Sequence, residues 1–84
     1  MRANPVARSW VVLMHSGVPA VDWGDGKYLD LMTMEFFTAE EKEISHRALE
    51  SDLHWLKQIG RIDDYDVNYI YLSNLPNFNS LEDN

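Results

Sequence analysis

The clearest pattern of apolar and polar positions lies in residues 38–60 and predicts one long amphipathic helix. No proline or glycine interrupts the segment before Gly60, and glycine is the residue that most often ends a helix. At about 100° per residue, the apolar side chains cover roughly half of the circumference and mixed charges occupy the rest. The apolar positions are Ile44, Ala48, Leu49, Leu53, Trp55, Leu56 and Ile59.

The predicted helix begins at Thr38 and contains one polar residue that needs an explanation. Thr38 and Glu41 have the spacing of a capping box, and acidic residues in the first turns favour the positive end of the helix dipole. Asp52 falls inside the apolar arc, where burial of an unpaired carboxylate is costly. Either Asp52 pairs with a base such as Arg61, or the helix straddles two packing surfaces, or Asp52 contacts a partner molecule.

Two further apolar segments predict strands at either end of the folded core. Residues 8–15 contain a nearly continuous apolar run, which is typical of a central strand covered on both faces. Residues 67–72 alternate, so Ile70 and Leu72 should share one face of the last strand. Between helix and last strand, Ile62 is the lone apolar residue of an acidic loop and is expected to tuck inward.

The segments 20–23 and 27–31 flank Gly24-Asp25-Gly26 and predict a β-hairpin with a bulged turn. Leu29 and Leu31 should face the core, since alternate strand residues share a face. Residues 32–37 are ambiguous, because they can extend the strand or turn before the two phenylalanines that would join the helix to the sheet.

The elements together follow the order β-β-β-α-β and predict an α+β fold, in which one long amphipathic helix packs across a small, mainly antiparallel sheet of three to four strands. Residues 1–84 form a single domain, with a flexible arm at 1–7, a folded core at 8–72 and an extended or disordered tail at 73–84. The connection from the helix to the last strand can be parallel or antiparallel. One helix leaves part of the sheet or of its own apolar arc uncovered, which favours a homodimer or a partner protein.

Composition narrows the class of protein. The chain has 84 residues, 45% of them hydrophobic, which argues against wholesale disorder. It contains no cysteine, so disulfides and thiolate metal sites are excluded, and a reducing, cytoplasmic location is expected. No apolar run approaches the length of a membrane span.

The net charge of −7 is unevenly placed along the chain. Residues 22–66 contain twelve acids and five bases, whereas residues 1–21 contain two arginines and no acid. This charge disfavours direct binding of nucleic acid or anionic membrane and is compatible with a basic protein partner. The alternative is that acidity only keeps a small domain soluble.

Two clusters combine carboxylates with an aromatic residue, and acidic surfaces of this kind can engage arginines as a phosphate backbone does. Solvated turns are the alternative interpretation of both clusters. With Asp52, the clusters make up the predicted partner-binding residues: Asp22, Trp23, Asp25 and Asp30 around the hairpin, and Asp63, Asp64, Tyr65 and Asp66 after the helix.

No constellation of an enzyme is evident, and we expect no catalytic residues, no cofactor and no metal. Helical metal pairs prefer a spacing of three or four residues, whereas His46 and His54 are eight apart with Glu50 between them. The aspartates of the hairpin lack the alternating ligands and distal glutamate of a calcium loop. The chain has no glycine-rich phosphate loop or nucleotide fingerprint.

The sequence therefore favours a small acidic inhibitor or modulator that occludes a basic, nucleic-acid-handling protein, in the manner of a nucleic-acid mimic. Its size, acidity and lack of cofactor motifs are also typical of many small virus-encoded inhibitors, which is a likeness of class and not of residues. One alternative is a structural or assembly subunit that acts through apolar self-association or docking. The other is a metal-dependent enzyme using His46, Glu50 and His54.

Overall fold

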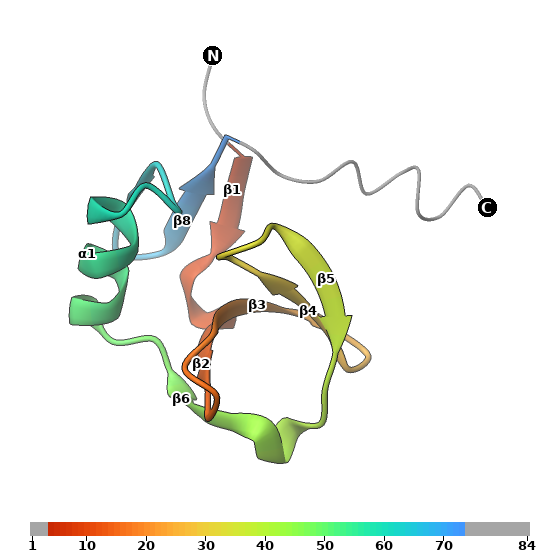
Figure 1. Ribbon diagram of the computed structural model, residues 1–84. Coiled ribbons are helices and arrows are strands. Elements are labelled where there is room, and N and C mark those ends of the chain that lie inside the picture. Colours follow the sequence, from red (N-terminus) through yellow and green to blue (C-terminus); the bar gives the residue numbers. More distant parts are fainter. Residues whose placement is uncertain (1–3, 74–84) are drawn as a thin grey trace, which may run out of the picture.

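The computed structural model describes residues 4–73 and contains one α-helix and two antiparallel sheets in that range (Figure 1). The helix is α1 (Glu50–Gln58), and two short 3-10 turns are η1 (Arg8–Trp10) and η2 (Glu41–Glu43). A five-stranded sheet has the order β5-β4-β3-β2-β6 and a three-stranded sheet the order β1-β8-β7. The strands are β1 (Asn4–Ala7), β2 (Val11–Met14), β3 (Pro19–Gly24), β4 (Lys27–Asp30), β5 (Glu35–Thr38), β6 (Ile44–Arg47), β7 (Asp64–Tyr65) and β8 (Tyr69–Leu72).

The α+β class is confirmed, but the proportions of the prediction are wrong. The α-helix has nine residues, and the larger sheet has five strands instead of three or four. Strands β2 to β5 form a meander, and β6 returns to pair with the other edge of β2. The sheet is strongly curled, with β5 and β6 at its two ends (Figure 1). The segment that contains η2 connects these two strands along the chain.

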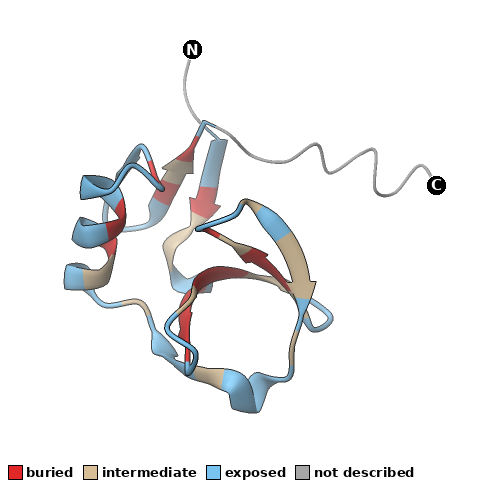
Figure 2. Ribbon diagram, in the orientation of Figure 1, coloured by how far each residue is buried: buried red, intermediate tan, exposed pale blue. Residues whose placement is uncertain are grey.

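Each face of this curled sheet carries its own core of buried residues (Figure 2). Residues that pair across β2, β3 and β4 alternate between the faces, as the pleat requires. The outer face packs against α1 and the three-stranded sheet through Val6, Val11, Val21, Leu29, Leu31, Leu53, Leu56, Ile62, Ile70 and Leu72. The inner face encloses Val12, Met14, Ala20 and Tyr28.

The predicted helix over residues 38–60 is wrong in its first half. Thr38 ends β5, residues 41–43 form η2, and residues 44–47 form β6. The predicted apolar face of the helix is wrong as well, because Leu49, Trp55 and Ile59 are exposed and only Leu53 and Leu56 of α1 are buried.

Edge pairing explains why the helical pattern does not form a helix here. Strand β2 is buried along its whole length, so its backbone groups need partners on both sides. Strand β6 supplies the second side, with Val12 opposite Arg47 and Leu13 opposite His46. Tertiary hydrogen bonding therefore overrides a helix propensity that is worth only fractions of a kcal/mol per residue.

The hairpin is confirmed. The strand predicted at residues 8–15 is confirmed only for the buried Val11–Met14 (β2), because residues 8–10 form η1, and it is the second strand of the chain since β1 precedes it. Strands β3 and β4 pair with Val21 opposite Leu29, and Gly24, Asp25 and Gly26 all have positive φ in the turn. Leu29 and Leu31 are fully buried, as expected. The ambiguous segment after the hairpin turns at residues 31–34 and continues as β5, so the phenylalanines belong to a strand and not to a helix.

The arm predicted at residues 1–7 lies partly within the described range, which begins at residue 4, and the tail predicted at 73–84 lies within it only at residue 73. Within that range, Asn4–Ala7 is not a loose arm but strand β1, which pairs antiparallel with β8 and buries Val6. Ile70 and Leu72 share the buried face of β8, and Ile62 is buried, as predicted. Residues 74–84 of the predicted tail lie outside the described residues.

Candidate functional site

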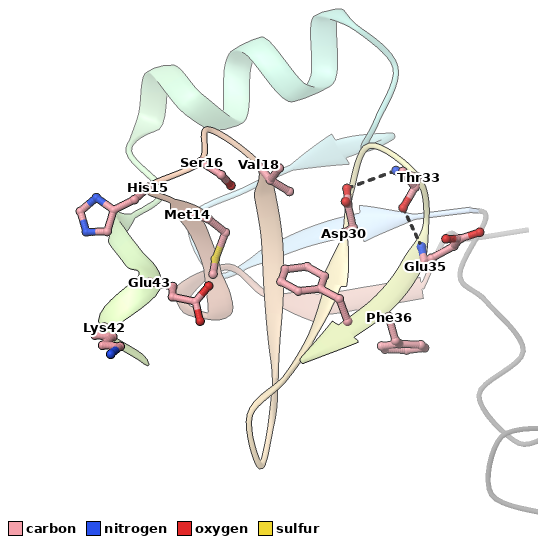
Figure 3. A pocket seen from close by; sticks show the side chains of 11 residues that line it. Met14, His15, Ser16, Val18, Asp30, Thr33, Glu35, Phe36, Lys42 and Glu43 are labelled. Atoms are coloured by element: carbon pink, nitrogen blue, oxygen red, sulfur yellow. Dashed lines mark hydrogen bonds between the residues drawn. The ribbon is translucent and has the colours of Figure 1, made fainter. Parts of the chain in front are cut away.

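A hollow of about 610 Å³ lies at the open side of the curled sheet (Figure 3). Figure 3 shows Asp30, Thr33 and Glu35 on one side of it and His15, Lys42 and Glu43 on the other, with Met14 between them. The segments that line it are the end of β2 with residues 15–18, the turn after β4, strand β5 and η2.

The floor of the hollow is apolar because it is the inner core of the sheet seen from its open side. Met14 is buried, and Val18 and Phe37 pack against the same cluster. The ring of Phe37 stacks on Tyr28 with ring centroids 5.6 Å apart and an interplanar angle of 24°. This offset stacking fixes the aromatic wall, since such pairs stabilise beyond the area that they bury.

One side of the rim is built by the turn after β4. The Asp30 carboxylate accepts hydrogen bonds from the amides of Met32 at 2.7 Å and Thr33 at 3.2 Å, through its Oδ1 atom. The Thr33 hydroxyl in turn accepts from the amide of Glu35 at 3.3 Å. These bonds hold the turn and engage only one oxygen of Asp30, while the Glu35 carboxylate points away from Met14 (Figure 3).

The opposite side of the rim is built by η2 and its anchor to β2. The amide of His15 donates to the carbonyl of Glu43 at 2.8 Å, which ties η2 to the end of β2. The Glu43 carboxylate accepts from the amide of Glu40 at 3.0 Å. Lys42 is paired with Glu40 at 3.4 Å, so its charge is already engaged by a carboxylate outside the lining.

Uncompensated negative charge surrounds the hollow. Within residues 4–73, the acids that form ion pairs are Glu40, Glu50, Asp52 and Asp64, and none of these lines the hollow. Burial, followed by the charges of Asp22, Glu41 and Glu43, raises the pKa of the Tyr28 hydroxyl above its ordinary value. Of the three acids, only Glu43 lines the hollow, so burial and acids of the neighbouring segments account for most of this shift.

The predicted binding cluster of the hairpin is mostly structural. Asp22 accepts from the amide of Gly24 at 3.0 Å, and Asp25 occupies the turn with φ of 58°. Trp23 packs on the outer core, and its ring meets Phe36 edge to face at 5.4 Å. Asp30 is the one predicted binding residue that lines the hollow.

The predicted binding cluster after the helix also builds local structure, on the other sheet. Asp63 accepts from the Ser73 hydroxyl at 3.1 Å, and Asp64 pairs with Lys57 at 3.1 Å. The hydrogen bond from Lys57, followed by the amide of Tyr65 and the charge of Lys57, lowers the pKa of the Asp64 carboxyl.

Asp66 has the densest set of contacts in this cluster. One oxygen accepts from the amides of Asn68 and Tyr69, each at 2.8 Å, and the other accepts from the Tyr71 hydroxyl at 2.6 Å. The Tyr71 hydrogen bond, followed by the two amides, holds the pKa of the Asp66 carboxyl below its ordinary value. The carboxylate keeps its charge, but its geometry is that of a turn-forming residue.

Asp52 is neither buried bare nor paired with Arg61. It lies in the first turn of α1, where its Oδ2 atom accepts from the amide of Leu49 at 2.8 Å and lies 3.2 Å from His46 Nε2. Tyr65 is half-buried, and the Arg8 guanidinium lies 5.6 Å from the centre of its ring.

The metal hypothesis required His46, Glu50 and His54 on one helix. His46 instead belongs to β6 and contacts Asp52, while Glu50 pairs with Arg8. Among residues 4–73, no group of three histidines or acids has an arrangement that could hold a metal ion.

Sequence reasoning missed most of the hollow. Its lining is Met14, His15, Ser16, Val18, Asp30, Thr33, Glu35, Phe36, Phe37, Lys42 and Glu43. These residues come from four separate segments, and only the curl of the sheet brings them together. The one local signal is the acidic and aromatic run 35–37, in which only the two phenylalanines were predicted to join the helix to the sheet.

Protein-family models, curated proteins and solved structures contain no match to this chain. In the part of the chain that the structure describes, no helix has both the length and the apolar character needed to cross a bilayer.

Proposed function

We propose that this chain is a small acidic binding protein that occludes a basic surface of a partner protein, and that the hollow of the curled sheet is its contact site. The observation that carries the proposal is the combination of an apolar floor with a rim of carboxylates that form no ion pair in residues 4–73. A surface of this composition attracts a cationic partner and then buries apolar area against it.

The distribution of charge supports a basic partner over a nucleic acid. The net charge is −7, and the clusters at the hairpin and at β7 are both acidic, although most of their carboxylates are engaged in turns. A polyanion would be repelled from this surface, whereas a basic protein would associate faster as the ionic strength falls. A nucleic-acid-handling partner fits this electrostatic requirement, because such proteins present basic patches.

The test is affinity capture with the immobilised chain from a lysate of the source organism, at low and at high salt, with identification by mass spectrometry. We expect basic proteins that are released at high salt, since the Debye length falls from about 10 Å at 0.1 M to about 3 Å at 1 M. Heparin, a polyanion that competes for basic surfaces, should displace them. Capture of acidic proteins only, or capture that salt and heparin leave unchanged, would contradict the proposal.

Charge substitutions should avoid the acids that hold turns. Asp64 and Asp66 are tied to Lys57 and to the turn before β8, so neutralising them perturbs the fold as well as the charge. Glu35 and Glu41 are exposed, and no hydrogen bond or ion pair of their carboxylates occurs within residues 4–73, so they are the suitable positions.

Apolar self-association is the second candidate function. Trp10, Val67 and Tyr69 are 51%, 80% and 45% exposed, and they offer apolar area that an interface would bury. Sedimentation velocity at micromolar concentration distinguishes the two functions. A concentration-dependent dimer that is lost on Val67→Ser would support assembly, whereas a monomer at all concentrations would exclude it.

A further inference from the structure

We propose that the hollow binds a small arylalkylamine, which is a molecule that carries one ammonium group on a short arm of an aromatic ring. The aromatic ring lies on the apolar floor of the hollow, and the ammonium group lies at the carboxylate of Glu43. The inference goes beyond the proposed function, because this ligand is a small molecule and its binding requires no protein partner.

The size and the floor of the hollow suit an aromatic ring. Its volume of about 610 Å³ falls within the range of roughly 300–1,000 Å³ that is usual for small-molecule sites. Met14, Val18 and Phe37 line it, and all three belong to the inner core or pack against it. The thioether of Met14 is a favourable neighbour for an aromatic ring, and the ring of Phe37 is held in place by its stacking on Tyr28. An aromatic ligand therefore meets a floor that is already formed.

Glu43 offers the ammonium group an acceptor that is already oriented. Figure 3 shows its carboxylate extending from η2 toward the middle of the hollow, whereas the His15 ring and the Glu35 carboxylate point away from it. The Oε2 atom of Glu43 accepts from the amide of Glu40 at 3.0 Å, and the Glu43 backbone carbonyl accepts from the amide of His15 at 2.8 Å. The Oε1 atom of Glu43 forms no hydrogen bond within residues 4–73. One oxygen thus fixes the carboxylate while the other is available to a ligand, and such preorganisation lowers the entropic cost of binding.

The charge of the lining selects a cation over an anion. Glu43 and Asp30 form no ion pair within residues 4–73, and the two amides that Asp30 binds engage only its Oδ1 atom. Lys42 also lines the hollow, but its ammonium group lies 3.4 Å from the carboxylate of Glu40, which is outside the lining. A carboxylate or phosphate is therefore repelled, whereas a neutral aromatic molecule gains only the apolar contacts. An aromatic ring with an ammonium group uses both the floor and Glu43.

The test compares phenethylamine with phenethyl alcohol and phenylpropanoate, which share its phenyl ring, and with ethylamine, which has the charge without the ring. Each compound is titrated into the full chain at neutral pH and constant ionic strength, where the amine is protonated as a lysine side chain is, and amide chemical shifts are followed by NMR. We expect phenethylamine to shift the amides of the lining segments and to bind about two- to fivefold more tightly than phenethyl alcohol, as one exposed charge contact allows. Ethylamine and phenylpropanoate should leave these amides unchanged. Absence of these shifts with phenethylamine, or equally tight binding of the alcohol or of phenylpropanoate, would overturn the inference.

Two glutamate variants of η2 separate the charge of Glu43 from the general acidity of the protein. Glu43→Gln keeps an oxygen that can accept from the Glu40 amide and removes the charge at the hollow, whereas Glu41→Gln removes the same charge from an exposed position outside the lining. We expect Glu43→Gln to weaken phenethylamine by about two- to fivefold and to leave phenethyl alcohol unchanged, and Glu41→Gln to change either ligand by less than about 1.5-fold. Equal weakening of the amine by both variants, or equal weakening of amine and alcohol by Glu43→Gln, would overturn the inference.

A third variant tests whether the ligand enters the hollow. Val18→Trp places a large side chain over the floor, and its thermal unfolding reports whether the fold is kept. In a folded Val18→Trp protein we expect phenethylamine to lose its shifts around the hollow, and retained binding would overturn the inference. If the variant does not fold, the glutamate pair decides between the outcomes. The proposed function is judged separately, by the salt dependence and heparin displacement of captured proteins, so that either proposal can fail while the other stands.

Discussion

Arg8 joins three elements of the outer core, and we predict that Arg8→Ala destabilises the protein by about 2 kcal/mol. Its Nη1 atom donates to the carbonyl of Asp66 at 2.8 Å, its Nη2 atom contacts the Glu50 carboxylate at the start of α1, and its guanidinium lies 5.6 Å from the centre of the Tyr65 ring. The side chain is only 23% exposed, so these contacts are partly shielded from water.

The magnitude follows from the separate contacts of this guanidinium. A charged donor on a carbonyl is worth about 1.5–3 kcal/mol, an exposed ion pair about 0.2–1 and a cation–π contact about 0.5–1. The sum overstates the loss, because the Asp66 carbonyl is exposed and water replaces the lost donor. Arg8→Lys keeps the charge without the planar fork, so we expect about half the loss.

The assay is urea unfolding at neutral pH, with Arg61→Ala as the control because Arg61 is an exposed arginine of the loop after α1. A double-mutant cycle of Arg8→Ala with Glu50→Gln should give a coupling of about 0.2–1 kcal/mol, since Glu50 is 68% exposed. If Arg8→Ala costs no more than Arg61→Ala, then the guanidinium does not link these elements and the reasoning fails.

Three further predictions concern residues that hold turns and helix ends. Asp66→Asn should destabilise the protein at neutral pH. Because the pKa of Asp66 is lowered in the folded state, its stabilising contribution is present above the ordinary pKa of 3.8 and is lost as the pH falls through the folded pKa, so the urea unfolding curves of wild type and variant should converge in acid. Asp52→Ala should cost about 1 kcal/mol in thermal unfolding of the chain alone because the Leu49 amide loses its acceptor, and an unchanged midpoint would favour a contact role for Asp52 instead. Gly60→Ala should cost about 1 kcal/mol in urea unfolding, since Gly60 has φ of 80° and an added Cβ meets no atom within 4 Å, so an unchanged stability would contradict the strain argument.

Local chemistry determined which elements the sequence could predict. The hairpin was predictable because Gly24 and Gly26 permit the positive φ of its turn, and the buried strand β2 because its apolar run is continuous. The helix over 38–60 was wrong because the residues of β6 fit a helical arc as well as a strand. The strand is favoured over the helix because β2 needs a second hydrogen-bonding partner, and β6 supplies it from about thirty residues further along the chain.

The candidate site was less predictable than the fold, for a related reason. A carboxylate looks the same in sequence whether it caps a turn, as Asp22 and Asp66 do, or stands at the mouth of a hollow, as Glu35 does. Asp30 does both, and it alone among the predicted residues lines the hollow. The two roles can be told apart only in the folded chain, where the curl of the sheet brings the lining residues together.

The pairing of β1 with β8 has a consequence for the order in which the molecule assembles. Asn4 lies opposite Leu72, so the smaller sheet joins residues that are 68 positions apart, whereas the larger sheet is contained in residues 11–47. Closing so long a loop costs conformational entropy that the contacts return only once they form. During synthesis, β8 therefore emerges only after nearly all of the described chain, so the pairing that buries Val6 forms after residues 11–47 have been made.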